Sequence, residues 1–355
     1  MNFSKIVKLV RLVKLITPVI VLIGFSSAVE NKAYASEISF MTYNVENLFD
    51  SKDDDNKKDE TFLPLKMKKI DDLCSQVKSS WRKKECESLN WDQEVIDDKM
   101  KQLSKVILSY GNGRGADIVV LPEVENLSIL KELNSRFLKK AGYVTVELVE
   151  GPDVRGIDIG VLSRFKKASA SKLHPVVWAK ASPKPKRPTR SVLEVTLDIG
   201  SNQKASVFGV HFPSPSHSIE ERKDAFDTLF KAAEKSKSDL IVAAGDFNVT
   251  ANEDSRLYRA YSSSKWSVSH HVGCGDCLGT NYYKPYGQKK AKDSWSFLDA
   301  IAVSKDSKYK FIPSSVAVWN TVDGMTKGPE KKPYRFNPES GKGYSDHFPL
   351  VAKFK

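Results

Sequence analysis

Polar residues end six of the apolar runs in this 355-residue chain, and they constrain its fold more than any other feature. Continuous apolar runs, such as Ile118–Leu121 and Leu240–Ala244, are typical of strands that are buried on both faces. The six polar signatures are Thr42-Tyr43-Asn44-Val45, Leu121-Pro122-Glu123, Val210-His211-Phe212-Pro213, Gly245-Asp246-Phe247-Asn248, Leu298-Asp299-Ala300 and Ser345-Asp346-His347. A carboxylate, amide or imidazole at a strand end is poorly placed for burial and well placed for a functional site.

Six such strand ends can bring several carboxylates and two imidazoles to one edge of a sheet. Like charges that lie this close repel one another and shift each other's pKa values unless a cation lies among them. A divalent metal ion that acts on a phosphate group is the simplest interpretation of this set.

The composition argues against gross disorder and favours a polyanionic partner. Hydrophobic residues make up 40% of the chain and aromatic residues 10%, which is ordinary for a globular protein. The net charge is +12, of which residues 1–35 contribute +4 and the remainder +8. This surplus favours nucleic acid or an anionic membrane over an acidic protein, and it says nothing about chemistry.

The N-terminus predicts a secretory signal peptide over residues 1–35. Basic residues between Lys5 and Lys14 precede the apolar stretch Leu15–Phe25, and Ala33-Tyr34-Ala35 matches a small-x-small cleavage pattern. The stretch is short for a membrane-spanning helix and contains Pro18, although an uncleaved anchor is the alternative because the charged segment is long. We therefore expect a secreted or periplasmic chain of residues 36–355, with no stable membrane insertion after cleavage.

The chain has four cysteines, an even number that suits an oxidising compartment. We expect local disulfides between Cys74 and Cys86 and between Cys274 and Cys277. In the alternative interpretation, His270 and His271 bind zinc together with the second cysteine pair. A redox role for the Cys-x-x-Cys pair is weaker, because no helical pattern follows it.

Hydrophobic patterns predict more strands than helices and a single domain after the signal peptide. The expected helices cover Val95–Tyr110, Leu127–Ala141 and Glu220–Ala233. The expected strands cover Ile38–Asn44, a segment from Asp117, Tyr143–Val149, Ile157–Ser163, Leu173–Trp178, Val192–Ile199, Ala205–Phe212, Leu240–Ala244, Phe297–Val303, Phe311–Trp319 and Phe348–Phe354. Residues 50–99, which begin with a run of charges, predict an inserted surface excursion that a disulfide staples and that has no direct chemistry. Two packed sheets with helices outside fit this order.

At the six signatures the chain resembles the endonuclease/exonuclease/phosphatase superfamily, over Ile38 to Phe354. Each signature alone is weak, but six in the family's order make a strong signal. The resemblance implies an exported, bacterial-type member with a four-layer α/β/β/α sandwich of two packed mixed sheets, a deoxyribonuclease I-like fold. It also implies a site at one edge of the two sheets.

The resemblance implies a role for each signature residue. Glu123 is similar to the main ligand of Mg²⁺ or Mn²⁺, with Asn44 beside it and Asp346 completing the set. Asp246 resembles the carboxylate that positions or deprotonates the attacking water, and Asn248 would hold that water or a phosphate oxygen. His347 with Asp299 resembles the pair that contacts the scissile phosphate, and His211 resembles the acid for the leaving oxygen. Each residue also has a structural alternative, such as an Asx turn at Asp246 and Asn248.

Two arginines are weaker candidates for contacts to the substrate phosphate. The superfamily often places polar residues on the strand that follows Arg155, and Arg190 begins a strand. A surface turn at Arg155 is an equal alternative. Structural Ca²⁺ sites in the loops are left open.

The substrate class is not fixed by the fold. Nucleic acid, either DNA or RNA, is favoured by export and by basic residues in three loops, at 180–190, 284–292 and 327–335. Tyr282, Tyr283 and Tyr286 lie among lysines, a mixture suited to base stacking.

We expect a secreted, metal-dependent endonuclease with little sequence preference and no protein partner. A sphingomyelinase-like or other lipid or inositol phosphodiesterase is the alternative, although no exposed apolar hairpin is evident. A non-catalytic binding module is disfavoured, because the residue set has no gaps.

Overall fold

The computed structural model describes residues 37–179, 188–284 and 294–355. Residues 37–355 form one compact unit. The expected signal peptide, most of the basic segment 180–190 and the lysines of 285–293 lie outside the described residues, as does Tyr286. Within the described ranges, no helix combines the length and apolarity needed to cross a bilayer.

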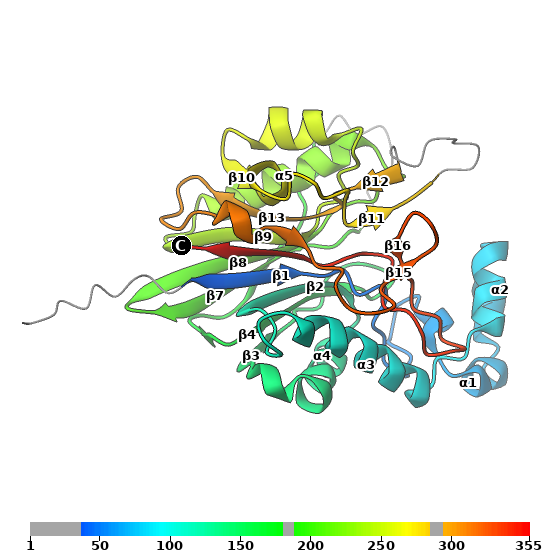
Figure 1. Cartoon of the computed structure of the whole chain (residues 1–355). Coiled ribbons are helices and arrows are strands. Elements are labelled where there is room, and N and C mark those ends of the chain that lie inside the picture. Colours follow the sequence, from blue (N-terminus) through cyan, green and yellow to red (C-terminus); the bar gives the residue numbers. More distant parts are fainter. Residues whose placement is uncertain (1–36, 180–187, 285–293) are drawn as a thin grey trace, which may run out of the picture. The chain divides into compact units, whose positions relative to one another are not determined.

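Two mixed sheets form the centre of this unit (Figure 1). The first has the order β14 (Ala317–Val318), β17 (Leu350–Phe354), β1 (Ile38–Thr42), β2 (Ile118–Val124), β4 (Asp158–Ser163) and β3 (Thr145–Glu147). The second has the order β10 (Trp266–Val268), β13 (Asp299–Ser304), β9 (Leu240–Asp246), β8 (Gln203–His211), β7 (Val192–Gly200) and β5 (Lys166–Lys167), and β6 (Lys172–His174) also pairs with β7. Two small hairpins pair β11 (Asn281–Tyr282) with β12 (Trp295–Ser296) and β15 (Thr326–Lys327) with β16 (Lys332–Pro333).

Three apolar clusters separate four layers. Side chains from both sheets, among them Phe40, Val120, Val207 and Val242, form the layer between the sheets. The outer face of the first sheet packs against α3 (Gln93–Ser109) and α4 (Leu127–Glu132). The outer face of the second packs against α5 (Ile219–Ala233) and the π-helix Ser255–Ser262. The expected α/β/β/α sandwich is therefore confirmed, and Figure 1 shows the helices outside both sheets.

Helix α3 illustrates how local sequence produces these layers. Asp92 caps the helix, since its side chain accepts hydrogen bonds from the backbone N–H groups of Glu94 and Val95. Met100, Leu103, Val106 and Ile107 then recur at helical spacing and are all buried. The 3.6-residue period thus directs one face of the helix onto the first sheet.

The insertion at 50–99 carries the helices η1 (Glu60–Phe62), α1 (Leu65–Ile70), η2 (Leu73–Gln76) and α2 (Ser80–Ser88). A disulfide joins Cys74 to Cys86. Its interpretation as surface decoration is wrong in part. Trp91 is 2% exposed and donates a hydrogen bond from Nε1 to the carbonyl of Phe49 at 3.1 Å, and Asp59 is fully buried within the charge run. The insertion therefore contributes to the core of the first sheet.

Three expected elements differ from the structure, and two of them differ at a proline. The strand expected over Leu173–Trp178 stops at His174, because Pro175 has no N–H for the ladder. The strand expected over Phe311–Trp319 is wrong, since Pro313–Ser315 forms a 3₁₀ turn (η7) and only β14 remains. The helix expected over Leu127–Ala141 continues after α4 as a π-helical turn, Leu133–Phe137 (η3), and a 3₁₀ turn, Lys139–Ala141 (η4).

Strand direction and register place the signature residues together. β1 runs parallel to β2, and β8 runs parallel to β9, so their carboxyl ends meet at one edge of the two sheets. His211 and Asp246 are register partners at the ends of β8 and β9. Asp299 opens the antiparallel strand β13 directly opposite Asp246.

Candidate active site

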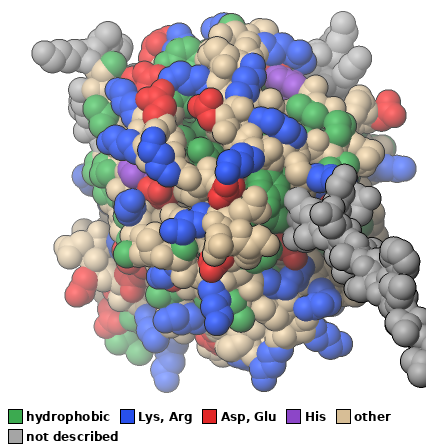
Figure 2. Space-filling model, turned by 90° about the vertical axis from the view of Figure 1, so that its left-hand side faces the viewer, with side chains coloured by type: hydrophobic (Ala, Val, Ile, Leu, Met, Phe, Trp, Pro, Cys, Tyr) green, Lys and Arg blue, Asp and Glu red, His purple; other side chains and the backbone are tan. Residues whose placement is uncertain are grey.

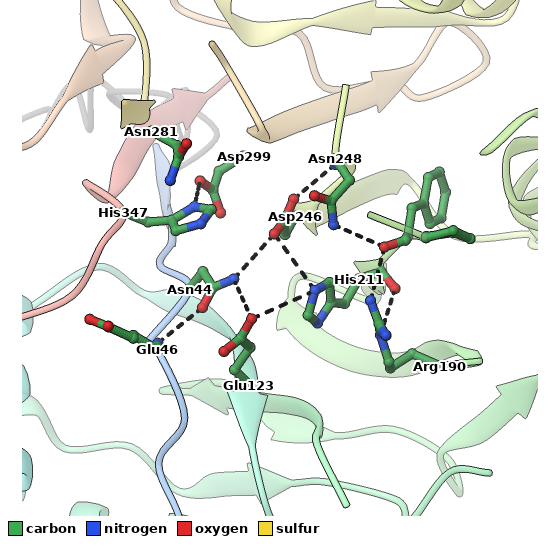
Figure 3. A network of polar contacts seen from close by, with 12 residues as sticks. Asn44, Glu46, Glu123, Arg190, His211, Asp246, Asn248, Asn281, Asp299 and His347 are labelled. Carbon is green, nitrogen blue, oxygen red and sulfur yellow. Dashed lines mark hydrogen bonds and ion pairs between the residues drawn. The ribbon is translucent and has the colours of Figure 1, made fainter. Parts of the chain in front are cut away.

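Four signature residues from four strand ends form one polar cluster (Figure 3). The Asn44 side chain donates from Nδ2 to Glu123 Oε1 at 3.2 Å and to Asp246 Oδ2 at 3.1 Å. His211 Nε2 lies 3.8 Å from Glu123 Oε1 and 3.7 Å from Asp246 Oδ2. Asp246 and His211 belong to the second sheet and Asn44 and Glu123 to the first, so the cluster bridges the two sheets.

A β-bulge directs Glu123 into the cluster. The pairing of β2 with β4 shifts register between Pro122 and Val124, and Glu123 has a φ of +68°. Such a backbone is unfavourable for a side chain other than glycine and tends to occur at functional sites. The Glu123 carboxylate is held there by the backbone N–H of Asn47, which donates to Oε2 at 3.2 Å.

The Gly245–Asn248 segment fixes Asp246 through an Asx turn. Asp246 Oδ1 accepts from the backbone N–H of Asn248 at 2.8 Å, while Oδ2 faces Asn44. Asn248 donates from Nδ2 to the carbonyl of Phe212 at 2.9 Å. The turn that was the structural alternative is therefore present, and it also aims one oxygen of Asp246 at the cluster.

His347 and Asp299 form a buried dyad beside this cluster. His347 Nδ1 lies 2.6 Å from Asp299 Oδ2, and the Asp299 side chain is fully buried. The backbone N–H of His347 donates to Ser345 Oγ at 3.1 Å, and Ser345 Oγ donates to the carbonyl of Asn44 at 2.7 Å. The Ser-Asp-His signature is thus tied directly to the first signature.

The two histidines differ in charge. Burial alone lowers the pKa of His347, but the charge of Asp299 and its hydrogen bond, with the charges of Asp346 and Asp246, raise it well above its usual value. Burial and the neighbouring Arg190 and Arg155 lower the pKa of His211 well below its usual range. The structure therefore favours a cationic ring at His347 and a neutral ring at His211, which makes His211 a poor proton donor to a leaving oxygen.

Asp246 is kept partly protonated near neutral pH. Burial and the charge of Asp299 raise its pKa to about 7, against the lowering effect of His347. A carboxyl whose pKa lies near neutrality is suited to general acid–base work.

Asp346 lies beside His347 and the guanidinium of Arg335. Its Oδ1 atom is 3.9 Å from His347 Nε2, and its Oδ2 atom is 3.9 Å from the guanidinium of Arg335. Arg335 also pairs with Glu46 at 2.5 Å. Asp346 is therefore linked to Glu46 through Arg335 and to the dyad through His347.

Glu46 belongs to the site and was not predicted. It is 9% exposed, its backbone N–H donates to Asn44 Oδ1 at 3.0 Å, and burial with the charge of Asp346 raises its pKa to about 7. Its position two residues after Asn44, in Asn44-Val45-Glu46-Asn47, is the sequence signal that could have identified it.

The two arginines serve different contacts. Arg190 pairs through Nη1 with Asp153 Oδ2 at 3.1 Å and donates to the carbonyls of His211 at 3.2 Å and Phe212 at 3.0 Å. It thereby anchors the end of β8. Arg155 donates to Asn47 Oδ1 at 2.7 Å and lies closer to the Glu123 side of the cluster.

The donor set fits a hard divalent cation. Glu123, Glu46 and Asp346 supply carboxylate oxygens and Asn44 an amide oxygen, the ligand types that Mg²⁺ and Mn²⁺ prefer. Glu46 is buried and is affected by the charge of Asp346, and like charges of this kind repel unless a cation lies between them.

The zinc alternative at the second cysteine pair lacks its thiolates, because a disulfide joins Cys274 to Cys277. His270 and His271 instead direct Nε2 at one oxygen of Asp254, at 3.1 and 2.8 Å. Both disulfides are compatible with an oxidising compartment.

Comparison with known proteins identifies the family. The Endonuclease/Exonuclease/phosphatase family profile matches residues 85–355. The chain belongs to the endonuclease/exonuclease/phosphatase family. The family resemblance inferred from the six signatures is thereby confirmed. Comparison with curated proteins gives no significant sequence match.

Solved structures of the endonuclease/exonuclease/phosphatase family share the fold. A family protein from Leptotrichia buccalis aligns over 90% of this chain and 99% of its own, with 15% identity and a TM-score of 0.55. D. rerio TDP2, complexed with a single-strand DNA product, aligns over 90% of this chain and 99% of its own, with 16% identity and a TM-score of 0.53. The human Nocturnin catalytic domain aligns over 90% of this chain and 94% of its own, with 17% identity and a TM-score of 0.51.

Proposed function

We propose that this protein is an exported, divalent-metal-dependent phosphodiester hydrolase that cleaves nucleic acid internally, with little sequence preference. The observation that carries the proposal is the meeting of Asn44, Glu123, Asp246 and His211 at one sheet edge beside the His347–Asp299 dyad. In-line attack on phosphorus requires an oriented water, positive charge at the phosphate and a stabilised leaving group. The cluster contains groups suited to each task.

The metal site would be formed by Glu123 and Asn44, with Glu46 and Asp346 close to them. A bound Mg²⁺ or Mn²⁺ supplies Lewis-acid stabilisation of charge on the phosphate oxygens. Glu123 contributes the anionic ligand atom, and the Asn47 N–H holds its carboxylate in place.

Asp246 would orient and accept a proton from the attacking water. Its Oδ2 atom faces the cluster, and a pKa of about 7 lets the ionised form be well populated at neutral pH while it still accepts a proton. Asn248 fixes this carboxylate through its backbone N–H.

His347 would stabilise the negative charge that builds on the phosphate. Asp299 holds Nδ1, so Nε2 is the nitrogen that can face a substrate oxygen. His211 would act as a neutral hydrogen-bond donor beside Glu123 and Asp246.

Nucleic acid is favoured over lipid as the substrate by charge. Lys327, Lys331, Lys332 and Arg335 lie around the β15–β16 hairpin, and Arg335 contacts Glu46 of the site. Tyr283 is 70% exposed and free to stack on a base. The positive charge is not confined to this edge: Figure 2 shows the side of the molecule where β17 ends, with lysine and arginine side chains spread among acidic ones.

A plasmid assay tests the proposal. Purified residues 36–355 should relax and degrade closed circular DNA with Mg²⁺ or Mn²⁺ and should stop when a chelator is added. Asp246→Asn should abolish turnover with little change in thermal stability. His347→Ala should also abolish turnover, but it should lower thermal stability as well, because it leaves the buried Asp299 carboxylate unpaired. Release of choline phosphate from sphingomyelin, with plasmid left intact, would instead identify a lipid phosphodiesterase.

A further inference from the structure

A second group of carboxylates lies beyond Glu123, where the insertion meets the end of β2. Asp54, Asp59 and Glu125 each place an oxygen within 4.8 Å of the others. Asp59 is fully buried, Glu125 is 1% exposed, and Asp54 is half-buried.

In two of these carboxylates, one oxygen accepts no hydrogen bond from the protein. Asp59 Oδ1 and Glu125 Oε1 are buried and have no hydrogen-bond partner. Their other oxygens are satisfied, because the N–H of Asp54 donates to Asp59 Oδ2 at 3.0 Å and the N–H of Asp50 donates to Glu125 Oε2 at 2.6 Å. Unpaired buried carboxylate oxygens are strongly unfavourable unless a cation contacts them.

A nearby lysine is directed elsewhere. Lys57 donates from Nζ to the carbonyl oxygens of Gly151, at 3.2 Å, and Asp153, at 3.1 Å. The three acids therefore lie close together, and two of them keep a buried oxygen without a protein donor.

We propose that Asp54, Asp59 and Glu125 bind one Ca²⁺ ion that fastens the insertion to the end of β2. Ca²⁺ takes six to eight oxygen ligands in flexible geometry, which suits carboxylates from separate chain segments better than the strict octahedron of Mg²⁺ does. The ion is structural and distinct from the metal proposed at Glu123. It holds the segment whose Asn47 N–H supports the Glu123 carboxylate.

Calcium binding in the presence of saturating Mg²⁺ tests this proposal without any activity assay. Equilibrium dialysis should find one Ca²⁺ bound per chain, and Ca²⁺ should raise the thermal unfolding midpoint. Glu125→Gln keeps an acceptor for the Asp50 N–H, and it should bind Ca²⁺ at least about tenfold more weakly, because affinity scales with ligand charge. Asp54→Asn, at the most exposed ligand, gives the same expectation should Glu125→Gln fail to fold.

Two controls separate this site from other effects. Glu194→Gln changes another buried glutamate, which pairs with His174 at 2.8 Å, and should bind Ca²⁺ as the wild type does. Glu123→Gln should also keep the ion, even where it abolishes hydrolysis, so that failure here is distinguishable from failure of the proposed function. The proposal is wrong if wild type binds no Ca²⁺, if Glu125→Gln and Asp54→Asn bind it unchanged, or if Glu123→Gln abolishes binding.

Discussion

His347 Nδ1 lies 2.6 Å from Asp299 Oδ2, although 48 residues separate them in the sequence. The pairing joins the starts of strands in different sheets, since Asp299 opens β13 of the second sheet and His347 precedes β17 of the first. Both side chains are buried, so the carboxylate stabilises a charged imidazole that would otherwise be neutral. The dyad can therefore hold a positive charge in a buried position, as the role proposed for it at the phosphate requires.

Removing the charge of Asp299 should change both rate and pH dependence. Asp299→Asn should lower kcat by about 10²–10⁴-fold. Because the pKa of His347 is raised by Asp299, the variant should lose the protonated ring at lower pH, and the alkaline limb of the rate profile should move to lower pH. A pH–rate profile that keeps its alkaline limb would contradict the role given to the dyad.

Glu123, the proposed metal ligand, should be needed for hydrolysis and not for folding. Glu123→Gln should lower activity by at least about 100-fold, and excess Mg²⁺ should recover part of it because the amide oxygen remains a weak ligand. Plasmid cleavage against Mg²⁺ concentration, with and without chelator, measures this. The unfolding midpoint should change little, since Glu123 is not fully buried. Full activity of the variant at low Mg²⁺ would place the metal elsewhere.

Arg190 should matter more for stability than for substrate affinity. Its side chain is 11% exposed and its partner Asp153 is 7% exposed, so Arg190→Met leaves a buried carboxylate unpaired. We expect a loss of about 3–5 kcal/mol in the free energy of unfolding, measured in urea. The double variant Arg190→Met/Asp153→Asn should recover part of it. Unchanged stability with a raised KM for DNA would instead support the phosphate contact expected from the sequence.

Asp158 should make stability depend on pH. Burial and the charge of Glu150 raise its pKa from 3.8 to about 7, so the folded state binds more protons than the unfolded state between these values. This contribution is fully present below about pH 4 and is lost as the pH rises to about 7. Asp158→Asn keeps an acceptor for the N–H of Gly151, which lies 3.0 Å from Asp158 Oδ2, and removes the titration.

Urea unfolding at about pH 5 and about pH 8 checks this expectation. The stability of the variant relative to wild type should increase toward the higher pH. A constant difference between the two proteins would mean that Asp158 ionises normally.

The sequence by itself determined the layer architecture and the strand ends that carry the cluster. Apolar periodicity is a local property, and it was enough to locate α3, α5 and most long strands. The polar signatures sufficed to name Asn44, Glu123 and Asp246, because a polar residue that ends a buried strand must face an edge. The strand predictions failed where a proline removed a ladder hydrogen bond, as at Pro313.

Only the tertiary structure decided which of these groups are charged, paired or buried. His211 and His347 look equivalent in sequence, but burial and nearby arginines lower the pKa of His211, while neighbouring carboxylates raise the pKa of His347. In the sequence, Glu46 and Asp59 look like ordinary surface acids, but the folded structure buries both of them. Burial and ion pairing depend on how segments far apart in the chain pack together. A local sequence pattern does not specify the spatial distances between such segments.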